Sequence, residues 1–231
     1  MDSLLLVTLL YEVVGKKEFQ KGLIDLIFKE ARNNEEAGEN KYIQIPNSVI
    51  SIGRCAFEDC YSLTSIIIPK SVTSIGHSAF YNCNSLTCIT LPDSVTSIEI
   101  GAFYKCTSLT SVNIPNSVTS IRTCAFRYCS GLTSIRIPNS VTSIEDYAFC
   151  DCNSLTSINI PDSVTTIEFD TCYKCSSLTS ITIPYLVTSI GECAFSNCIN
   201  LISITIPRFF EKRMKDIFTY VDLSSIKITY I

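Results

Sequence analysis

Residues 115–137 read PNSVTSIRTCAFRYCSGLTSIRI, and Pro138 then begins the same pattern again. The eight prolines of the chain stand 23 residues apart: Pro46, Pro69, Pro92, Pro115, Pro138, Pro161, Pro184 and Pro207. A mixed globular core imposes no such period. The spacing predicts that residues 46–207 are seven copies of one unit stacked in a line, with a period in the leucine-rich range.

Each copy holds two short segments of strand character, Ser-Val-Thr-Ser-Ile and Ser-Leu-Thr-Ser-Ile. In the second segment Ile135 and Ile137 are expected to point inward and Arg136 outward, because side chains alternate along a strand. The segment 125–129 between them is expected to form a helical or 3₁₀-like turn. Proline lacks an N–H and ends the longer strand.

Stacking pairs each strand in parallel with its counterpart, so the apolar positions merge into ladders. The valine ladder is invariant from Val49 to Val187, whereas the phenylalanine ladder from Phe57 to Phe195 breaks at Cys172. At that break we expect either a local void or a compensating ring, for which Phe169 is the candidate.

The chain divides into three parts. Residues 1–42 show helical patterning and are expected to be a helical N-terminal cap or a docking segment, since a solenoid end exposes its core. Residues 43–207 are the repeats. Residues 208–231 leave the register and are expected to form a C-terminal cap with a degenerate half-repeat at 223–228.

Thirteen cysteines raise the question of a disulfide scaffold. Seven of them recur 14 residues after a proline: Cys60, Cys83, Cys106, Cys129, Cys152, Cys175 and Cys198. A residue type at one repeat position predicts a buried ladder, and free cysteine packs as a small apolar residue. Bridges between rungs about 5 Å apart stay open, but inert thiols in a reducing compartment are favoured.

The whole pattern resembles the BspA-like leucine-rich repeats, also called the Treponema pallidum type, over about residues 43–207. One copy carries it as Ser71-Val72-Thr73-Ser74-Ile75 with Ala79-Phe80, Cys83 and Leu86-Thr87. The resemblance implies a right-handed curved solenoid with a parallel sheet on its concave side. It also implies binding roles, because such proteins are often surface adhesins in bacteria and protozoan parasites.

The outward position between the two inward isoleucines forms what we call the polar strip. Its members are Ile67, Thr90, Asn113, Arg136, Asn159, Thr182 and Thr205. A mostly neutral polar strip about 35 Å long suits a peptide or protein surface, with Arg136 as anchor. A solvated sheet without a partner is the alternative.

Other groupings are weaker. Acids gather on adjacent repeats, which suggests a cation site or a solvated acidic face: Glu145, Asp146, Asp151, Glu168 and Asp170. An aromatic stripe or packing between rungs would explain Tyr81, Tyr104, Tyr128 and Tyr173.

Spacing like that of a zinc site appears at Cys150, Cys152, Cys172 and Cys175, but core ladder positions account for most of these thiols. The single histidine, His77, could meet Cys55 or Cys88.

The sequence therefore predicts a leucine-rich repeat solenoid of seven repeats with no catalytic residue, metal or cofactor. The net charge of −4 gives no footprint for nucleic acid, and no apolar run reaches a membrane span. The apolar start lacks a basic n-region, so we expect no signal peptide. We expect an intracellular protein-interaction scaffold. The alternatives are a cell-surface adhesin, or a component of a larger assembly docked through residues 1–42 and the cluster Arg208, Lys212, Arg213 and Lys215.

Overall fold

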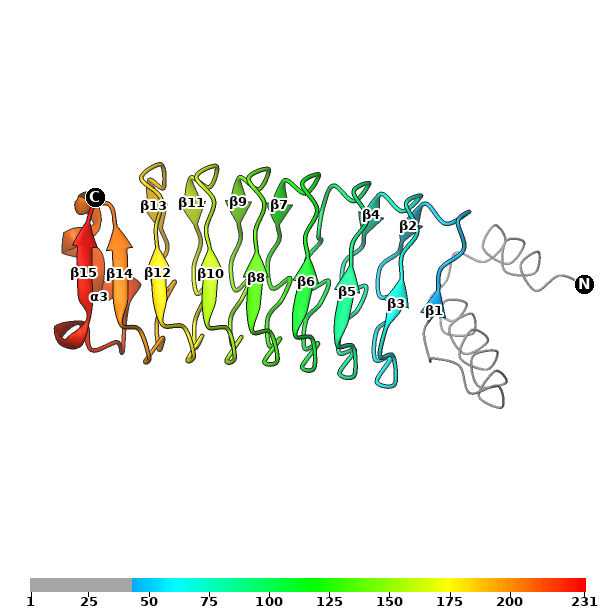
Figure 1. Cartoon of the computed structure of the whole chain (residues 1–231), viewed down its shortest axis with the longest axis horizontal. Coiled ribbons are helices and arrows are strands. Elements are labelled where there is room, and N and C mark those ends of the chain that lie inside the picture. Colours follow the sequence, from blue (N-terminus) through cyan, green and yellow to red (C-terminus); the bar gives the residue numbers. More distant parts are fainter. Residues whose placement is uncertain (1–42) are drawn as a thin grey trace, which may run out of the picture.

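The computed structural model describes residues 43–231 as a parallel β-solenoid whose turns succeed one another along the long axis (Figure 1). The helical segment expected in residues 1–42 lies outside the described residues. Each turn contributes one strand to a nine-stranded sheet, in the order β1-β3-β5-β6-β8-β10-β12-β14-β15. Its strands are β1 (Ile43–Gln44), β3 (Ile66–Ile67), β5 (Cys88–Thr90), β6 (Ser111–Asn113), β8 (Ser134–Arg136), β10 (Ser157–Asn159), β12 (Ser180–Thr182), β14 (Ser203–Ile206) and β15 (Lys227–Tyr230).

The Ser-Val-Thr-Ser-Ile segments supply the second side of the solenoid, as predicted. Their strands are β2 (Ser51–Ile52), β4 (Ser74–Ile75), β7 (Ser120–Ile121), β9 (Ser143–Ile144), β11 (Thr166–Ile167) and β13 (Ser189–Ile190). Ile98 bridges Ile75 on one side and Ile121 on the other, so the short strands form one continuous parallel series. Partners within it are 23 residues apart, as Ile121 and Ile144 illustrate.

The predicted ladders fill the space between the two sheets. The rings of Phe57, Phe80, Phe103, Phe126 and Phe149 stack with centroids 5.1–5.6 Å apart. The ladder thiols also have a defined role. Cys129, for example, donates to the carbonyl oxygen of Phe103 at 3.1 Å, and Cys152 donates to that of Phe126 at 3.2 Å. All thirteen cysteines are free thiols, and the ladder members belong to the core.

The turn between the strands differs from the helical or 3₁₀ form expected for residues 125–129. Cys124 and Tyr128 have φ of 57° and 61°, so the chain passes through short turns and not a helix. Residues other than glycine pay a conformational cost in left-handed backbone. Hydrogen bonds to the next turn offset this cost, because the N–H groups of Cys124, Phe126 and Tyr128 donate to carbonyls one turn further on at 2.8–2.9 Å.

The break in the phenylalanine ladder is not filled by Phe169, so this prediction was wrong. Phe169 is 38% exposed, and its ring meets the edge of Tyr147 at 5.6 Å. The neighbouring core position changes instead. Thr171 stands where other rungs have alanine and is buried, with its hydroxyl donating to the Glu168 carbonyl at 2.7 Å. The larger Thr171 offsets part of the volume lost at Cys172.

Residues 208–231 keep the register longer than the sequence suggested and build an eighth turn. They form η2 (Arg208–Arg213), α3 (Met214–Ile217), η3 (Leu223–Ser225) and β15. Phe218 lies 23 residues after Phe195 and stacks on it at 5.4 Å. The N–H of Asn197 donates to the Thr219 carbonyl, which continues the rung-to-rung bonding. The last turn is one residue longer than the 23-residue repeat, because β15 pairs Lys227 with Ser203, 24 residues earlier.

Of the half-repeat predicted at 223–228, residues 223–225 form η3, and β15 begins at Lys227 and extends the nine-stranded sheet in parallel beside β14. Figure 1 places this strand at the red end of the solenoid, opposite β1. Within residues 43–231, no helix has the length and apolar character needed to cross a membrane.

Candidate functional site: the outer face of the nine-stranded sheet

The structure brings the residues of the polar strip into one continuous row across the nine-stranded sheet. Strand pairing aligns Ile67 with Thr90, Thr90 with Asn113, and Asn113 with Arg136. Arg136 is in turn aligned with Asn159, and Thr182 with Thr205. Six of the seven side chains are exposed and Thr205 is partly exposed. The inward neighbours Ile135 and Ile137 are buried, so the strip lies on the solvent side.

Two further positions extend the strip beyond the predicted set. Gln44 aligns with Ile67 at one end, and Thr229 aligns with Thr205 at the other. Gln44 could have been found from the sequence, because it stands between Ile43 and Ile45 in the same alternation. Thr229 could not be found by the 23-residue rule, since the extra residue of the last turn displaces it to 24.

The strip deepens into a groove of about 530 Å³ near its first strands. Ile67, Thr90 and Asn113 belong to its lining, as do the residues of the adjoining proline turns. Those turn residues are Lys70, Pro92, Asp93 and Ser94. Ile67 is apolar and 48% exposed, whereas the strip positions that follow it are polar. An apolar side chain beside an amide, a cation and an anion suits a short stretch of polypeptide.

Arg136 occupies the middle of the strip and is flanked there by Asn113 and Asn159. In the described part of the chain, the ion pair between Arg122 and Glu99, at 3.5 Å, is the only one. Arg136 is therefore an exposed cation whose charge no carboxylate in residues 43–231 offsets. An arginine in such a position offers a planar set of donors to a carboxylate or a carbonyl on a partner.

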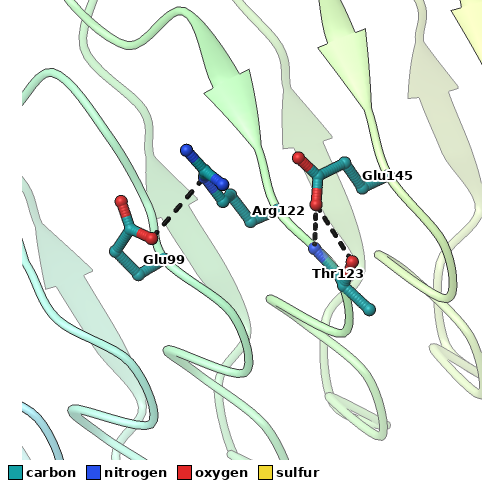
Figure 2. A network of polar contacts seen from close by, with 4 residues as sticks. All are labelled: Glu99, Arg122, Thr123 and Glu145. Atoms are coloured by element: carbon teal, nitrogen blue, oxygen red, sulfur yellow. Dashed lines mark hydrogen bonds and ion pairs between the residues drawn. The ribbon is translucent and has the colours of Figure 1, made fainter.

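Two of the acidic side chains on adjacent repeats link successive turns. Glu145 accepts hydrogen bonds from the backbone N–H of Thr123 at 3.0 Å and from its hydroxyl at 2.9 Å, beside the Glu99–Arg122 pair (Figure 2). Asp146 likewise accepts from the N–H of Phe169 at 3.1 Å. These contacts explain Glu145 and Asp146 as part of the scaffold.

Of the four cysteines whose spacing resembles a zinc site, three donate hydrogen bonds to different acceptors. Cys150 donates to the carboxylate of Asp151 at 3.3 Å, whereas Cys152 and Cys175 donate to backbone carbonyls of the phenylalanine ladder. Within residues 43–231, no three His, Cys, Asp or Glu side chains are grouped as metal ligands would be.

The predicted tyrosine stripe exists in part. Tyr81 and Tyr104 stack at 4.9 Å, and Tyr128 meets Tyr104 edge-on at 5.4 Å. Tyr173 contacts Lys174 instead, which lies 5.2 Å from its ring. The sequence missed Arg127, whose guanidinium lies 4.6 Å from the ring of Tyr147 and 5.0 Å from that of Tyr128. All these tyrosines are partly buried, so packing between turns accounts for much of the stripe.

The histidine and cysteine candidates meet only through the backbone, where the N–H of Cys55 donates to the His77 carbonyl at 2.9 Å. Burial, and a hydrogen bond that the thiol donates to the Glu58 carboxylate, raise the pKa of Cys55. A nucleophilic thiol needs the opposite shift. Cys88 is exposed, in register with Ser111 on the outer face of the sheet.

Comparison with known proteins agrees with the repeat architecture. The family model of the BspA type leucine rich repeat region matches residues 35–153 and 119–230, in six copies. A leucine-rich repeat protein of T. pallidum has a similar structure, with a TM-score of 0.68, 29% identity, and coverage of 78% of this chain and 85% of that one. No curated protein matches the sequence significantly.

A leucine rich cell surface protein of Faecalibacterium prausnitzii is also similar in structure. The TM-score is 0.65 and the identity is 41%, over 72% of this chain and 48% of that one. A leucine-rich repeat protein of Bacteroides ovatus matches with a TM-score of 0.51 and 26% identity, over 82% of this chain and 77% of that one.

Proposed function

Because the chain belongs to the BspA-type leucine-rich repeat family, we propose that it is a non-enzymatic scaffold that binds a protein partner through its polar strip. The observation that carries the proposal is the exposed Arg136, which has no ion-pair partner within residues 43–231 and stands at the centre of an otherwise neutral row. The groove at Ile67 supports it, because it places an apolar side chain at the beginning of the same row. Together they form an extended surface with a charged anchor and an apolar anchor.

Affinity capture from the source organism, followed by binding measurements with the captured partner, tests this surface. Changing Arg136→Glu and Asn159→Glu is expected to weaken binding at least about tenfold, because a repulsive charge then replaces the anchor. Thr165→Glu is the matched control, since it places the same side chain at an exposed position beside β11 on the other sheet. Equal binding by the native chain, the variant with Glu at 136 and 159, and the Thr165→Glu control would refute the role of the strip.

We place this scaffold inside the cell, on the support of thirteen free cysteines, because exposed thiols persist in reducing compartments. The alternative is an adhesin on the cell surface, which is favoured by the similarity to the F. prausnitzii cell surface protein. Alkylation of thiols under denaturing conditions in freshly opened cells, followed by mass measurement, separates the two locations, because the buried thiols react only in the unfolded chain. Thirteen alkylated cysteines are expected inside the cell, whereas native disulfides would contradict that location.

A further inference from the structure

The residues that follow each proline show a regular polar pattern through most of the solenoid. In the first six turns these pairs are Asn47-Ser48, Lys70-Ser71, Asp93-Ser94, Asn116-Ser117, Asn139-Ser140 and Asp162-Ser163. From the second turn onward, the serine hydroxyl donates to the valine carbonyl of the preceding turn at 2.5–2.7 Å. The serine therefore stabilises the contact between successive turns.

The pattern is broken in the last two turns, where the pairs are Tyr185-Leu186 and Arg208-Phe209. Tyr185 is 67% exposed, and Leu186 and Phe209 are each 57% exposed. Leu186 and Phe209 both stand where the earlier turns have the hydrogen-bonding serine. These two turns thus replace a stabilising polar side chain with an apolar one that stays largely in water.

The proline turn keeps the same backbone hydrogen bond at these two rungs. The N–H of Val187 donates to the Pro184 carbonyl at 3.1 Å, and that of Phe210 to the Pro207 carbonyl at 3.0 Å. Phe210 is buried at the position of the valine ladder. Leu186 and Phe209 are therefore register neighbours about one strand spacing, roughly 5 Å, apart. We call Tyr185, Leu186 and Phe209 the C-terminal turn patch.

The same repeat is also apolar at the other end of β14. Ile202 stands where six earlier turns have threonine, and Ile199 stands where five of them have Asn, Ser or Thr. Both isoleucines are more than half exposed. The corresponding threonine hydroxyls donate to the carbonyl one turn back, as Thr179 does to Thr156 at 3.3 Å. The exposed apolar substitutions therefore span both ends of one strand, and none of them gains the burial that stabilises a fold.

Positive charge borders the C-terminal turn patch. Residues 208–215 hold four basic residues, Arg208, Lys212, Arg213 and Lys215, against one acid, Glu211, in a chain of net charge −4. Arg208 lies directly beside Phe209 in the sequence, with its guanidinium 5.4 Å from the ring of Tyr230. An apolar centre with a cationic border is complementary to leucine or aromatic side chains flanked by carboxylates.

We propose that the C-terminal turn patch is a second binding surface, and that its partner is an acidic protein segment carrying apolar side chains. This surface is separate from the polar strip and does not depend on the function proposed for it. An anionic membrane carries the same sign of charge as such a segment, and the vesicle measurement below distinguishes the two. The residues of the C-terminal turn patch directly follow two buried prolines, Pro184 and Pro207, and such anchored side chains suit a protein interface.

The test uses the full chain and a displayed library of random dodecapeptides. The selected peptides are expected to combine Asp or Glu with Leu, Phe or Trp, and to bind more weakly as salt is raised from about 50 to 500 mM. The double variant Leu186→Ser and Phe209→Ser, which restores the serine of the other turns, is expected to weaken binding at least about tenfold. Its Tm is expected to be unchanged or higher, because serine hydrogen bonds are regained.

The matched control is Ile50→Ser, which removes an apolar side chain of similar exposure at the opposite end of the solenoid. It is expected to leave peptide binding unchanged. Selection of no peptide, selection of basic peptides, or equal binding by the double variant would overturn the proposal. The proposal would also be overturned if the native chain and the Ile50→Ser control bound phosphatidylcholine vesicles containing about 30% phosphatidylserine and the double variant did not. Dimerisation of the native chain that the double variant abolishes would assign the patch to a second copy instead.

Discussion

The stacked rings of the phenylalanine ladder predict a graded loss of stability when single rings are removed. Phe126 is fully buried between Phe103 at 5.2 Å and Phe149 at 5.6 Å, with interplanar angles of 5° and 3°. Within residues 43–231, Phe57 has one ring neighbour, Phe80 at 5.1 Å. Truncating a buried phenylalanine to alanine costs about 3–5 kcal/mol, and each aromatic pair adds about 0.5–1.5 kcal/mol beyond its buried area.

We therefore expect Phe126→Ala to lose about 4–5 kcal/mol and Phe57→Ala about 3 kcal/mol of unfolding free energy. Urea unfolding followed by far-UV circular dichroism gives the two values. Hydrogen exchange should show the lost protection centred on the turns that hold Phe103–Phe149, because each turn of a solenoid contacts only its neighbours. A cost at Phe57 equal to that at Phe126, or a loss below about 2 kcal/mol at Phe126, would refute this reasoning.

Two further predictions concern backbone contacts and thiols. Gly131→Ala is expected to cost about 2–3 kcal/mol in urea unfolding, because the added Cβ would lie 2.6 Å from the Thr107 carbonyl oxygen. Gly101→Ala should cost only about 1 kcal/mol, because Gly101 has a φ of 61° but its added Cβ would make only ordinary contacts, at 3.4 Å or more. Burial raises the pKa of the Cys129 and Cys152 thiols. Above about pH 8.5 the unfolded chain ionises these thiols and the folded chain does not, so stability should fall by up to about 1.4 kcal/mol per thiol per pH unit. A urea midpoint that stays constant from about pH 7 to 10 would contradict this.

The sequence predicted the ladders well because each occupies one position in a fixed period. One residue type recurring every 23 residues identifies a core position whatever its backbone conformation. The turn at 125–129 was harder, because its left-handed residues include Cys124 and Tyr128, which are not typical of that conformation. Only the bonds to the next turn, as from Tyr128 N–H to the Cys150 carbonyl at 2.8 Å, explain it.

The error at Phe169 could have been avoided by comparing repeats. Its counterparts in neighbouring turns are Thr123 and Asp146, polar residues that indicate an outward position. Proximity to Cys172 in the sequence was the weaker guide. The eighth turn was hidden for a different reason, because Phe210 and Ile217 replace the small residues of the valine and alanine ladders. Their register becomes visible only through the stack of Phe218 on Phe195.

The repeats also separate binding from folding within a single chain, since every turn serves as a comparison for the others. A change at a core position alters packing, but an apolar residue at a solvent position that is polar elsewhere has no folding benefit. Ile67 in the groove and the C-terminal turn patch of Tyr185, Leu186 and Phe209 meet this criterion, as do the exposed residues Ile50, Ile199 and Ile202. The strands β3 and β14 are six steps apart in the sheet, or about 29 Å at the usual spacing. The groove and the C-terminal turn patch therefore lie near opposite ends of the sheet, and a short peptide bound at one leaves the other free.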